Sequence, residues 1–268
     1  MSGLHVPFLS AGQQVRMLGD AHGDPWFWRD VLLRDGNRHN IRRALLYLAH
    51  SDLDVPRTLI RARLGDNDSR TRAWACACLA RLGDQASLDQ LHHLTLDASA
   101  RVRYHARQAL CALSPDAEVE RHERAQVGAT ALVSEDSLVN QTMLARLLTQ
   151  CGLRVICASA ETTTCVRARG FRPTLIVTDN QKGHDNTSGL RMTEGLAADL
   201  ALSETLLFMV SADAVEGVFL WNGGDAFVHK SVGWPGRLLG LLSAFLGAEP
   251  GAAHHSGRPT GGTDGQQV

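Results

Sequence analysis

Between residues 128 and 247, short apolar runs rich in β-branched residues alternate with longer amphipathic stretches. The runs are expected to be strands, and the stretches between them helices. Strands that alternate with helices form βαβ units and build a parallel sheet. Five such units in about 120 residues predict a doubly wound, five-stranded, flavodoxin-like α/β domain. The expected strands are ATALVS (129–134), RVICAS (154–159), TLIVTD (174–179), TLLFMVS (205–211) and DAFVHK (225–230).

Polar side chains stand where these strands end. Glu135 and Asp136 follow the first strand, and Asp179 ends the third. Ser211 ends the fourth strand and Lys230 the fifth. Because open parallel sheets bind ligands at the carboxyl ends of their strands, these groups are expected to meet at one edge.

The chemistry of such a cluster follows from its residue types. Three carboxylates repel one another and need a counter-ion, and Mg²⁺ is a hard cation that prefers oxygen ligands. A carboxylate can act as a nucleophile toward a phosphoryl group and form an aspartyl-phosphate. A metal and a lysine then neutralise the phosphoryl oxygens, and a short hydroxyl can hydrogen-bond one of them.

Four segments, ALVSEDSLVNQ (131–141), TLIVTDN, MVSAD and GGDAFVHK, resemble the receiver domains of response regulators, especially those of hybrid histidine kinases. The resemblance covers about 120 residues and all five strands in order. It implies that Asp179 is the phospho-acceptor and that Ser211, Lys230 and Phe227 are the switch hydroxyl, the phosphate partner and the aromatic that reports activation. It implies Mg²⁺ as cofactor, with these ligands: Glu135, Asp136, Asp179 and the backbone carbonyl of Gln181.

Two features depart from the family pattern. Receivers usually carry Met-Pro soon after the phospho-acceptor and a glycine eight residues beyond it, whereas this loop reads NQKGHDNTSG and Gly189 falls ten residues on. Ser231 replaces the proline that usually follows the lysine. Taken singly, each site residue is also open to a structural reading, as a helix cap, a turn residue or a core aromatic. A purely structural role is harder to assign to Lys230. The chain has only one other lysine, and Arg and Lys are not interchangeable at compact charge sites.

Residues 37–115 contain an internal repeat. Three segments share a polar turn, an arginine and an Ala/Leu-rich helix, and Arg42, Arg72 and Arg103 are matched at spacings of 30 and 31 residues. A period of this length predicts stacked helical units. The pattern resembles HEAT repeats, with the best match at ARVR (100–103). An irregular helical bundle is the alternative.

The remaining segments complete the expected organisation. Residues 1–36 are expected to form a helical cap or extension, 116–127 a linker and 248–268 a disordered tail. The formal net charge of -1 removes the electrostatic case for nucleic acid or membrane as main partner. No apolar run is long enough to span a bilayer and no signal peptide is evident, so a cytoplasmic protein is expected.

These features together predict a two-component response regulator rather than an enzyme. Phosphorylation at Asp179 is expected to control protein–protein interactions through the HEAT-like repeats. The expected partners are a sensor histidine kinase or phosphotransfer protein, a protein target of the repeats, and a second copy of the chain. No DNA-binding domain is recognised. Phe219, Leu220 and Trp221 are adjacent on one expected helix and cannot all face inward, so this segment is a candidate interaction face.

Three alternatives remain open. In the first, the domain is a pseudo-receiver that binds partners without phosphorylation. In the second, the helical half acts as a lyase or chaperone on a prosthetic group, as some HEAT-like proteins do. The third alternative makes the helical half a histidine phosphotransfer module. Its histidines are His39, His50, His92, His93 and His105.

Overall fold

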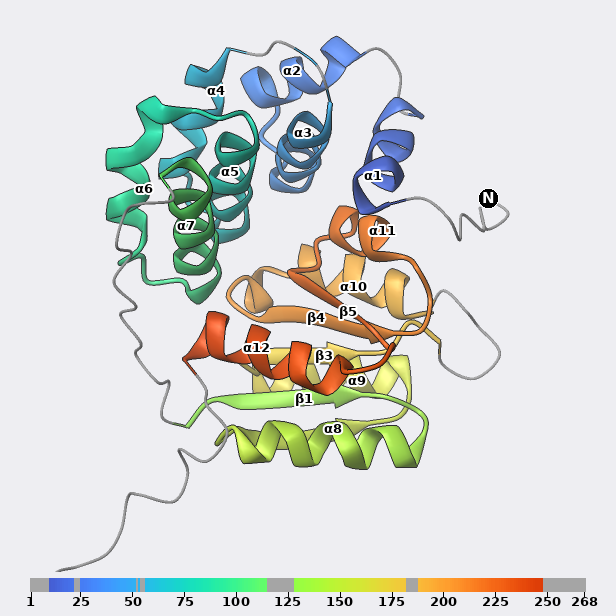
Figure 1. The fold of residues 1–268 in the computed structure, drawn as a ribbon. Coiled ribbons are helices and arrows are strands. Elements are labelled where there is room, and N and C mark those ends of the chain that lie inside the picture. The colour runs from blue at the N-terminus through green and yellow to red at the C-terminus, as the bar shows by residue number, and fades with distance from the viewer. Residues whose placement is uncertain are drawn as a thin grey trace, which may run out of the picture.

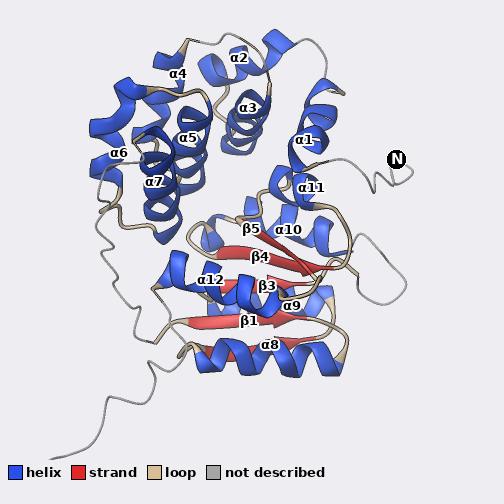
Figure 2. Cartoon of the chain, viewed as in Figure 1, coloured by secondary structure: helices blue, strands red, loops and turns tan. Residues whose placement is uncertain are grey.

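A computed structural model describes residues 10–21, 25–51, 53, 56–114, 128–181 and 188–247. The described chain folds into helices up to residue 113 and then into a five-stranded α/β domain (Figures 1 and 2). The expected linker and C-terminal tail lie outside the described residues. Within the described ranges, no helix is long and apolar enough to cross a membrane.

The helical half begins with two helices that precede the repeats and continues with paired helices around one apolar core. Its helices are α1 (Ala11–Asp20), α2 (Pro25–Arg34), α3 (Arg38–His50), α4 (Arg57–Ala62), α5 (Ser69–Arg81), α6 (Leu88–Leu94) and α7 (Ala100–Leu113), with 3₁₀ turns η1 (Arg63–Gly65) and η2 (Gln85–Ser87).

The repeat unit is set by the helices α3, α5 and α7, whose N-cap residues Asn37, Asp68 and Ser99 lie 31 residues apart. Counted from these caps, Arg72 and Arg103 occupy the same position, but its equivalent in α3 is Ile41. The predicted match of Arg42 was therefore wrong by one residue. The repeat position in α3 holds Ile41, and the two arginines Arg42 and Arg43 follow it, so the nearest arginine in the sequence is one residue out of register.

Arg72 and Arg103 make the same contacts with the turn before their own helix. Each donates through Nη1 to the two carbonyls that precede its own helix cap. Arg72 also forms a bidentate ion pair with Asp97 of the next repeat, at 3.0 Å from Nε and 2.9 Å from Nη2. A planar guanidinium holds a carboxylate in fixed geometry in this way, which fixes the register between neighbouring repeats.

The α/β domain has one parallel sheet in the order β2-β1-β3-β4-β5. This is the doubly wound order of flavodoxin-like domains, as predicted. The strands are β1 (Thr130–Ser134), β2 (Arg154–Ala158), β3 (Leu175–Thr178), β4 (Leu206–Ser211) and β5 (Ala226–His229), each within one residue of its predicted bounds at either end.

Helices cover both faces of the sheet. Apolar side chains of α8 (Leu138–Gln150) and α12 (Trp234–Leu246) pack on one face. Those of α9 (Glu161–Phe171), α10 (Ser188–Ala198) and α11 (Glu216–Trp221) pack on the other, and the 3₁₀ turn η3 (Leu200–Leu202) follows α10. The strands are buried almost throughout, except on the two edge strands β2 and β5.

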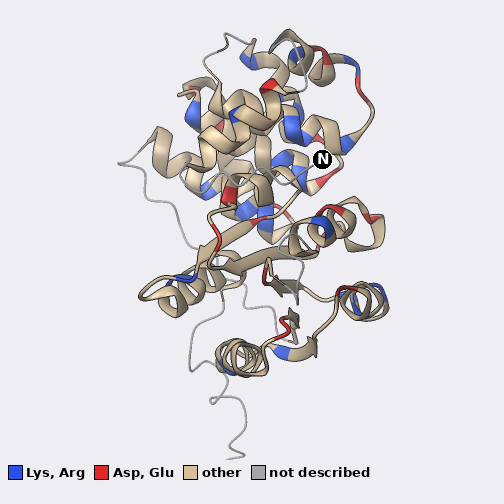
Figure 3. Cartoon of the chain, turned by 90° about the vertical axis from the view of Figure 1, so that its right-hand side faces the viewer, with Lys and Arg blue, Asp and Glu red and all other residues tan. Residues whose placement is uncertain are grey.

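The helical half docks on the α/β domain near the amino ends of β4 and β5. Arg70 and Arg101, both 1% exposed, each donate to the carbonyls of Ser203 and Thr205. Arg101 also forms a bidentate pair with the buried carboxylate of Asp225. Figure 3 shows basic and acidic residues side by side where the two halves meet.

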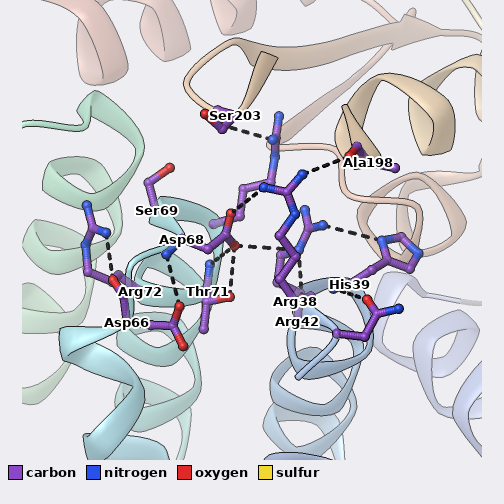
Figure 4. Close-up of polar contacts among 12 residues, drawn as sticks. Arg38, His39, Arg42, Asp66, Asp68, Ser69, Thr71, Arg72, Ala198 and Ser203 are labelled. Atoms are coloured by element: carbon purple, nitrogen blue, oxygen red, sulfur yellow. Dashed lines mark hydrogen bonds and ion pairs between the residues drawn. The ribbon is translucent and has the colours of Figure 1, made fainter. Parts of the chain in front are cut away.

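Arg38 extends this row of arginines to the first repeat. Its Nη2 donates to the carbonyl of Ala198 at the end of α10, at 2.8 Å (Figure 4). Asp68, the cap of α5, lies between Arg38 and Arg42, at 3.7 and 3.8 Å. Its carboxylate therefore helps to hold two arginines of the neighbouring repeat in place next to the α/β domain.

The predicted interaction face on α11 is an intramolecular contact. Phe219 is fully buried in the core of the α/β domain, and Trp221, 4% exposed, packs in the helical core. Leu220 is half-buried against both cores. The expectation that part of this segment is free for a partner was therefore wrong: α11 lies between two domains and buries two opposite faces. Trp221 meets the ring of Trp28 edge-on at 5.4 Å and lies under the Arg43 guanidinium.

Candidate functional site

The predicted site residues meet at the carboxyl edge of the sheet because the strands pair in register there. Ser134, the last residue of β1, is level with Thr178 at the end of β3. Ser211 is level with His229 on β5. The residues that follow these ends, Glu135, Asp179 and Lys230, therefore point into the same small region.

Lys230 joins the two buried carboxylates. Its Nζ lies 2.6 Å from Asp179 Oδ2 and 3.2 Å from Glu135 Oε2. Burial on its own lowers the pKa of Lys230, but the hydrogen bond and charge of Asp179, together with Glu135, raise that pKa above its ordinary value. The ammonium therefore remains charged at neutral pH and neutralises part of the negative charge of the two carboxylates.

Glu135 is 1% exposed and lies directly after β1. Burial raises the pKa of its carboxyl group, the Lys230 ammonium lowers it, and the neighbouring Asp179 carboxylate raises it further. The net pKa lies above the ordinary glutamate value. Its Oε1 accepts a hydrogen bond from the amide of Ser137 at 3.1 Å, which fixes the carboxylate at the start of α8.

Asp179 sits in a tight backbone cradle. Its Oδ1 accepts the amide hydrogen of Asn180 at 2.6 Å, while Oδ2 faces Lys230. Gly189 returns against it from α10: a Cβ on this glycine would lie 2.2 Å from the Asp179 carbonyl oxygen. Gly189, which falls two residues later than in the family pattern, thus still approaches Asp179 closely, and its lack of a side chain permits that approach.

The loop after β4 adds a carboxylate that the sequence did not single out. Asp213 accepts hydrogen bonds from Asn180 Nδ2 at 2.8 Å and from Gln181 Nε2 at 3.1 Å. Its amide lies 3.3 Å from Ser211 Oγ and donates to it. The only sequence signal for Asp213 is its place two residues after a strand-end serine, which is also typical of a helix cap.

The other predicted site residues lie at the margin of this cluster. Asp136 is exposed and lines a surface hollow with Leu138 and Ser159. Gln181 is exposed. Phe227 is half-buried on β5, its ring 6.3 Å from that of Phe219. Residues 182–187, which complete the atypical loop, lie outside the described residues.

The donor types at this edge suit a hard divalent cation, since they are carboxylates with a backbone carbonyl nearby. In the described part of the chain no three His, Cys, Asp or Glu side chains form a ready metal-binding group. Lys230 instead bridges Glu135 and Asp179. The buried carboxylates of Glu135 and Asp179 carry two negative charges, and Lys230 supplies only one positive charge. An additional cation at this edge would fit that charge balance.

The five histidines considered for phosphotransfer lie on three different helices of the repeats. His39 and His50 lie on α3, His92 and His93 on α6, and His105 on α7. Burial and the neighbouring arginines lower the pKa of His39 to about 4. This distribution favours structural roles within the repeats over one shared phosphotransfer helix.

Comparison with known proteins finds similarities for both halves of the chain. A model of HEAT repeats matches residues 27–111. No curated protein sequence matches the chain. Among solved structures, the receiver domain of a sensor histidine kinase from Pseudomonas aeruginosa, solved with a magnesium ion in its active-site cleft, is 23% identical (TM-score 0.40) and covers 45% of this chain and 98% of its own.

Two other solved structures are similar over the same share of the chain. A chemotaxis protein of Vibrio cholerae is 19% identical over 44% of this chain and 99% of its own, with a TM-score of 0.40. A response regulator from Burkholderia multivorans is 24% identical over 43% and 92%, with a TM-score of 0.35. The strand order and the repeat match together show a chain in which N-terminal repeats that match the HEAT model precede a doubly wound, flavodoxin-like α/β domain.

Proposed function

We propose that this protein is a response regulator whose Asp179 accepts a phosphoryl group. The observation that carries the proposal is the contact of Lys230 with both Asp179 and Glu135 at the carboxyl edge of the sheet, with Ser211 at the end of the adjacent strand. A buried carboxylate pair held by one ammonium serves no evident purpose in stabilising the fold, because buried ion pairs seldom add net stability.

The reaction assigns a role to each group. A free Oδ electron pair of Asp179 attacks the phosphorus of a phosphohistidine or an acyl phosphate. The bond from phosphorus to the donor nitrogen or oxygen breaks, and its electron pair stays on the leaving group. Lys230 and the Ser211 hydroxyl then bind the phosphoryl oxygens on Asp179. Mg²⁺, held by Glu135, Asp136, Asp179 and the Gln181 carbonyl, would supply further charge neutralisation.

The proposal makes the protein a signalling component rather than an enzyme, with self-phosphorylation and self-dephosphorylation as its only reactions. Its donor would be a sensor histidine kinase or phosphotransfer protein in the cytoplasm. The repeats, which in solenoid proteins offer extended surfaces to partners, would carry the output to a protein target.

Binding of beryllium fluoride, which mimics a phosphoryl group, tests the site. Isothermal titration calorimetry in Mg²⁺ is expected to show one-to-one binding to the full chain and none to Asp179→Asn. Asp30→Asn, at an exposed ion pair on α2, is the matched control and is expected to bind like the wild type. Equal binding by Asp179→Asn, or no binding by the wild type, would contradict the proposal and favour a pseudo-receiver.

A pull-down identifies the output. The full chain is used as bait with beryllium fluoride and Mg²⁺, and Asp179→Asn is used under the same conditions. A protein retained by one bait and not by the other is the expected result. Identical sets of retained proteins would contradict control of partner binding by Asp179.

A further inference from the structure

Helix α1 lies between the repeats and the α/β domain, next to α11 (Figure 1). On the repeat side it is firmly attached. Tyr47 donates its hydroxyl to Asp20 Oδ1 at 2.6 Å, and Trp28 Nε1 donates to the Gly19 carbonyl at 3.2 Å. The helix also starts with a complete capping box at Ser10 and Gln13, which stabilises its first turn.

On the other side α1 packs against α11, and Gln14 supplies hydrogen bonds to its first turn and to the loop before it. Gln14 is 2% exposed, and its amide makes two hydrogen bonds to the backbone of the α/β domain. Nε2 donates to the carbonyl of Ala214 at 2.7 Å, and Oε1 accepts the amide hydrogen of Gly217 at 2.9 Å. The approach is close: a Cβ on Gly217 would lie 2.4 Å from the carbonyl oxygen of Ala11.

The segment that Gln14 holds is the loop after the predicted switch serine. The amide of Asp213 donates a hydrogen bond to Ser211 Oγ, and its carboxylate accepts one from Asn180 Nδ2. Ala214, the next residue, offers its carbonyl to Gln14. One peptide unit therefore separates a residue in contact with the phospho-acceptor loop from a residue in contact with α1.

We propose that Gln14 is a positioning residue for the phosphorylation site, and that docking of α1 on α11 opposes phosphorylation of Asp179. This inference rests on the proposed function. A phosphoryl group adds negative charge next to the Asp213 carboxylate and draws the Ser211 hydroxyl toward its own oxygens. Both effects displace Asp213 and, with it, the carbonyl of Ala214. The two hydrogen bonds to Gln14 fit only the present position of that loop.

Two other parts of the interdomain contact do not involve α1: Trp221 near the end of α11 packs against Trp28 and Arg43, and the buried arginines bind at the amino ends of β4 and β5. Thr205 and Asp225 precede β4 and β5, whereas Ser211 ends β4. The arginine contacts to Thr205 and Asp225 are buried and hold the two halves together when α1 leaves α11. Helix α1 is the helix that binds the loop itself, through Gln14 and the Ala214 carbonyl, and its contact with the α/β domain is therefore the one expected to change with the site.

Coupling between two sites is reciprocal. If phosphorylation weakens the docking of α1, then loss of docking strengthens binding of the phosphoryl mimic by the same factor. Gln14→Leu removes both hydrogen bonds at similar volume and keeps good helix propensity. Gly217→Ala displaces α1 by steric contact while favouring α11. Arg16→Gln, on the exposed side of α1, is the matched control.

Two measurements on the full chain test the inference. Hydrogen exchange of residues 11–20 is expected to accelerate in wild type and Arg16→Gln when beryllium fluoride and Mg²⁺ are added, and to be fast in Gln14→Leu and Gly217→Ala already without them. Calorimetry is expected to show beryllium fluoride affinity on the order of tenfold higher in both of the latter variants.

The outcomes separate the two proposals. If beryllium fluoride binds but neither the exchange of α1 nor the affinity of the two variants changes, the inference on Gln14 is overturned and the proposed function stands. If beryllium fluoride does not bind to any folded variant, both are overturned. Should Gly217→Ala fail to fold, Gln14→Leu alone decides, since it keeps the backbone of α11 unchanged.

Discussion

Replacement of Asp225 by asparagine is expected to destabilise the protein strongly. The Asp225 carboxylate is buried, accepts the Arg101 guanidinium in bidentate fashion, and accepts the Leu207 amide at 2.8 Å. Arg70 Nη2 lies 3.9 Å away. The substitution leaves two buried arginines without their shared counter-ion. Removal of one partner of a buried pair costs about 3–5 kcal/mol, a large part of the 5–15 kcal/mol typical of a folded domain.

Urea unfolding of the full chain, followed by circular dichroism, measures the change in free energy. Asp30→Asn is the matched control, because Asp30 pairs with Arg29 at 3.4 Å on the surface and such pairs contribute about 0–1 kcal/mol. A loss below about 1 kcal/mol for Asp225→Asn would refute the view that this carboxylate neutralises the interdomain arginines.

The pH dependence gives a second check on Asp225. Burial raises the pKa of its carboxyl group, but the charges of Arg101 and Arg70 and the hydrogen bonds lower that pKa below the ordinary value overall. The stabilisation by Asp225 is therefore present above the pKa of the unfolded chain, near 3.9, and is lost as the pH falls through the folded pKa. Asp225→Asn is expected to lack this loss.

Three further predictions concern the site and the repeats. Gly189→Ala is expected to weaken beryllium fluoride binding measured by calorimetry, because the new Cβ would displace the Asp179 carbonyl; unchanged binding would show that the close approach is not needed. Lys230→Arg is expected to slow phosphorylation from acetyl phosphate by at least about tenfold, since a planar guanidinium cannot replace a compact ammonium; a wild-type rate would contradict this. The stability of the protein, measured by urea unfolding, is expected to fall as the pH drops from about 6.5 toward 4. The cause is three histidines whose pKa is lowered to about 4 by burial and nearby arginines, so that the unfolded chain takes up protons first: His39, His50 and His105. A flat profile over this range would contradict that assignment.

The sequence sufficed to predict the sheet and the strand-end residues because both depend on local pattern. Buried parallel strands read as short β-branched runs, and a polar residue directly after such a run must lie at the carboxyl edge. Glu135, Asp179, Ser211 and Lys230 were therefore placed without any knowledge of side-chain contacts. Asp213 was missed because its role depends on Asn180, which lies 33 residues earlier in the chain.

The relation between the two halves could not be predicted from the sequence. Phe219 and Trp221 have the composition of an exposed apolar face. The structure shows instead that Phe219 lies in the core of the α/β domain and that docking of the helical half buries Trp221. The repeat register was misread at Arg42 because the arginines were used to align the repeats. The fully buried alanines Ala44, Ala75 and Ala106 recur every 31 residues and mark the register better than the arginines do.

Mass spectrometry of the full chain after incubation with acetyl phosphate and Mg²⁺ directly tests whether Asp179 is phosphorylated. A mass gain of one phosphoryl group is expected in the wild type, located by fragmentation on the peptide that contains Asp179. No gain is expected in Asp179→Asn or when the metal is chelated. A gain of the same size in Asp179→Asn, or no gain in the folded wild-type protein, would contradict the claim that Asp179 is a phospho-acceptor.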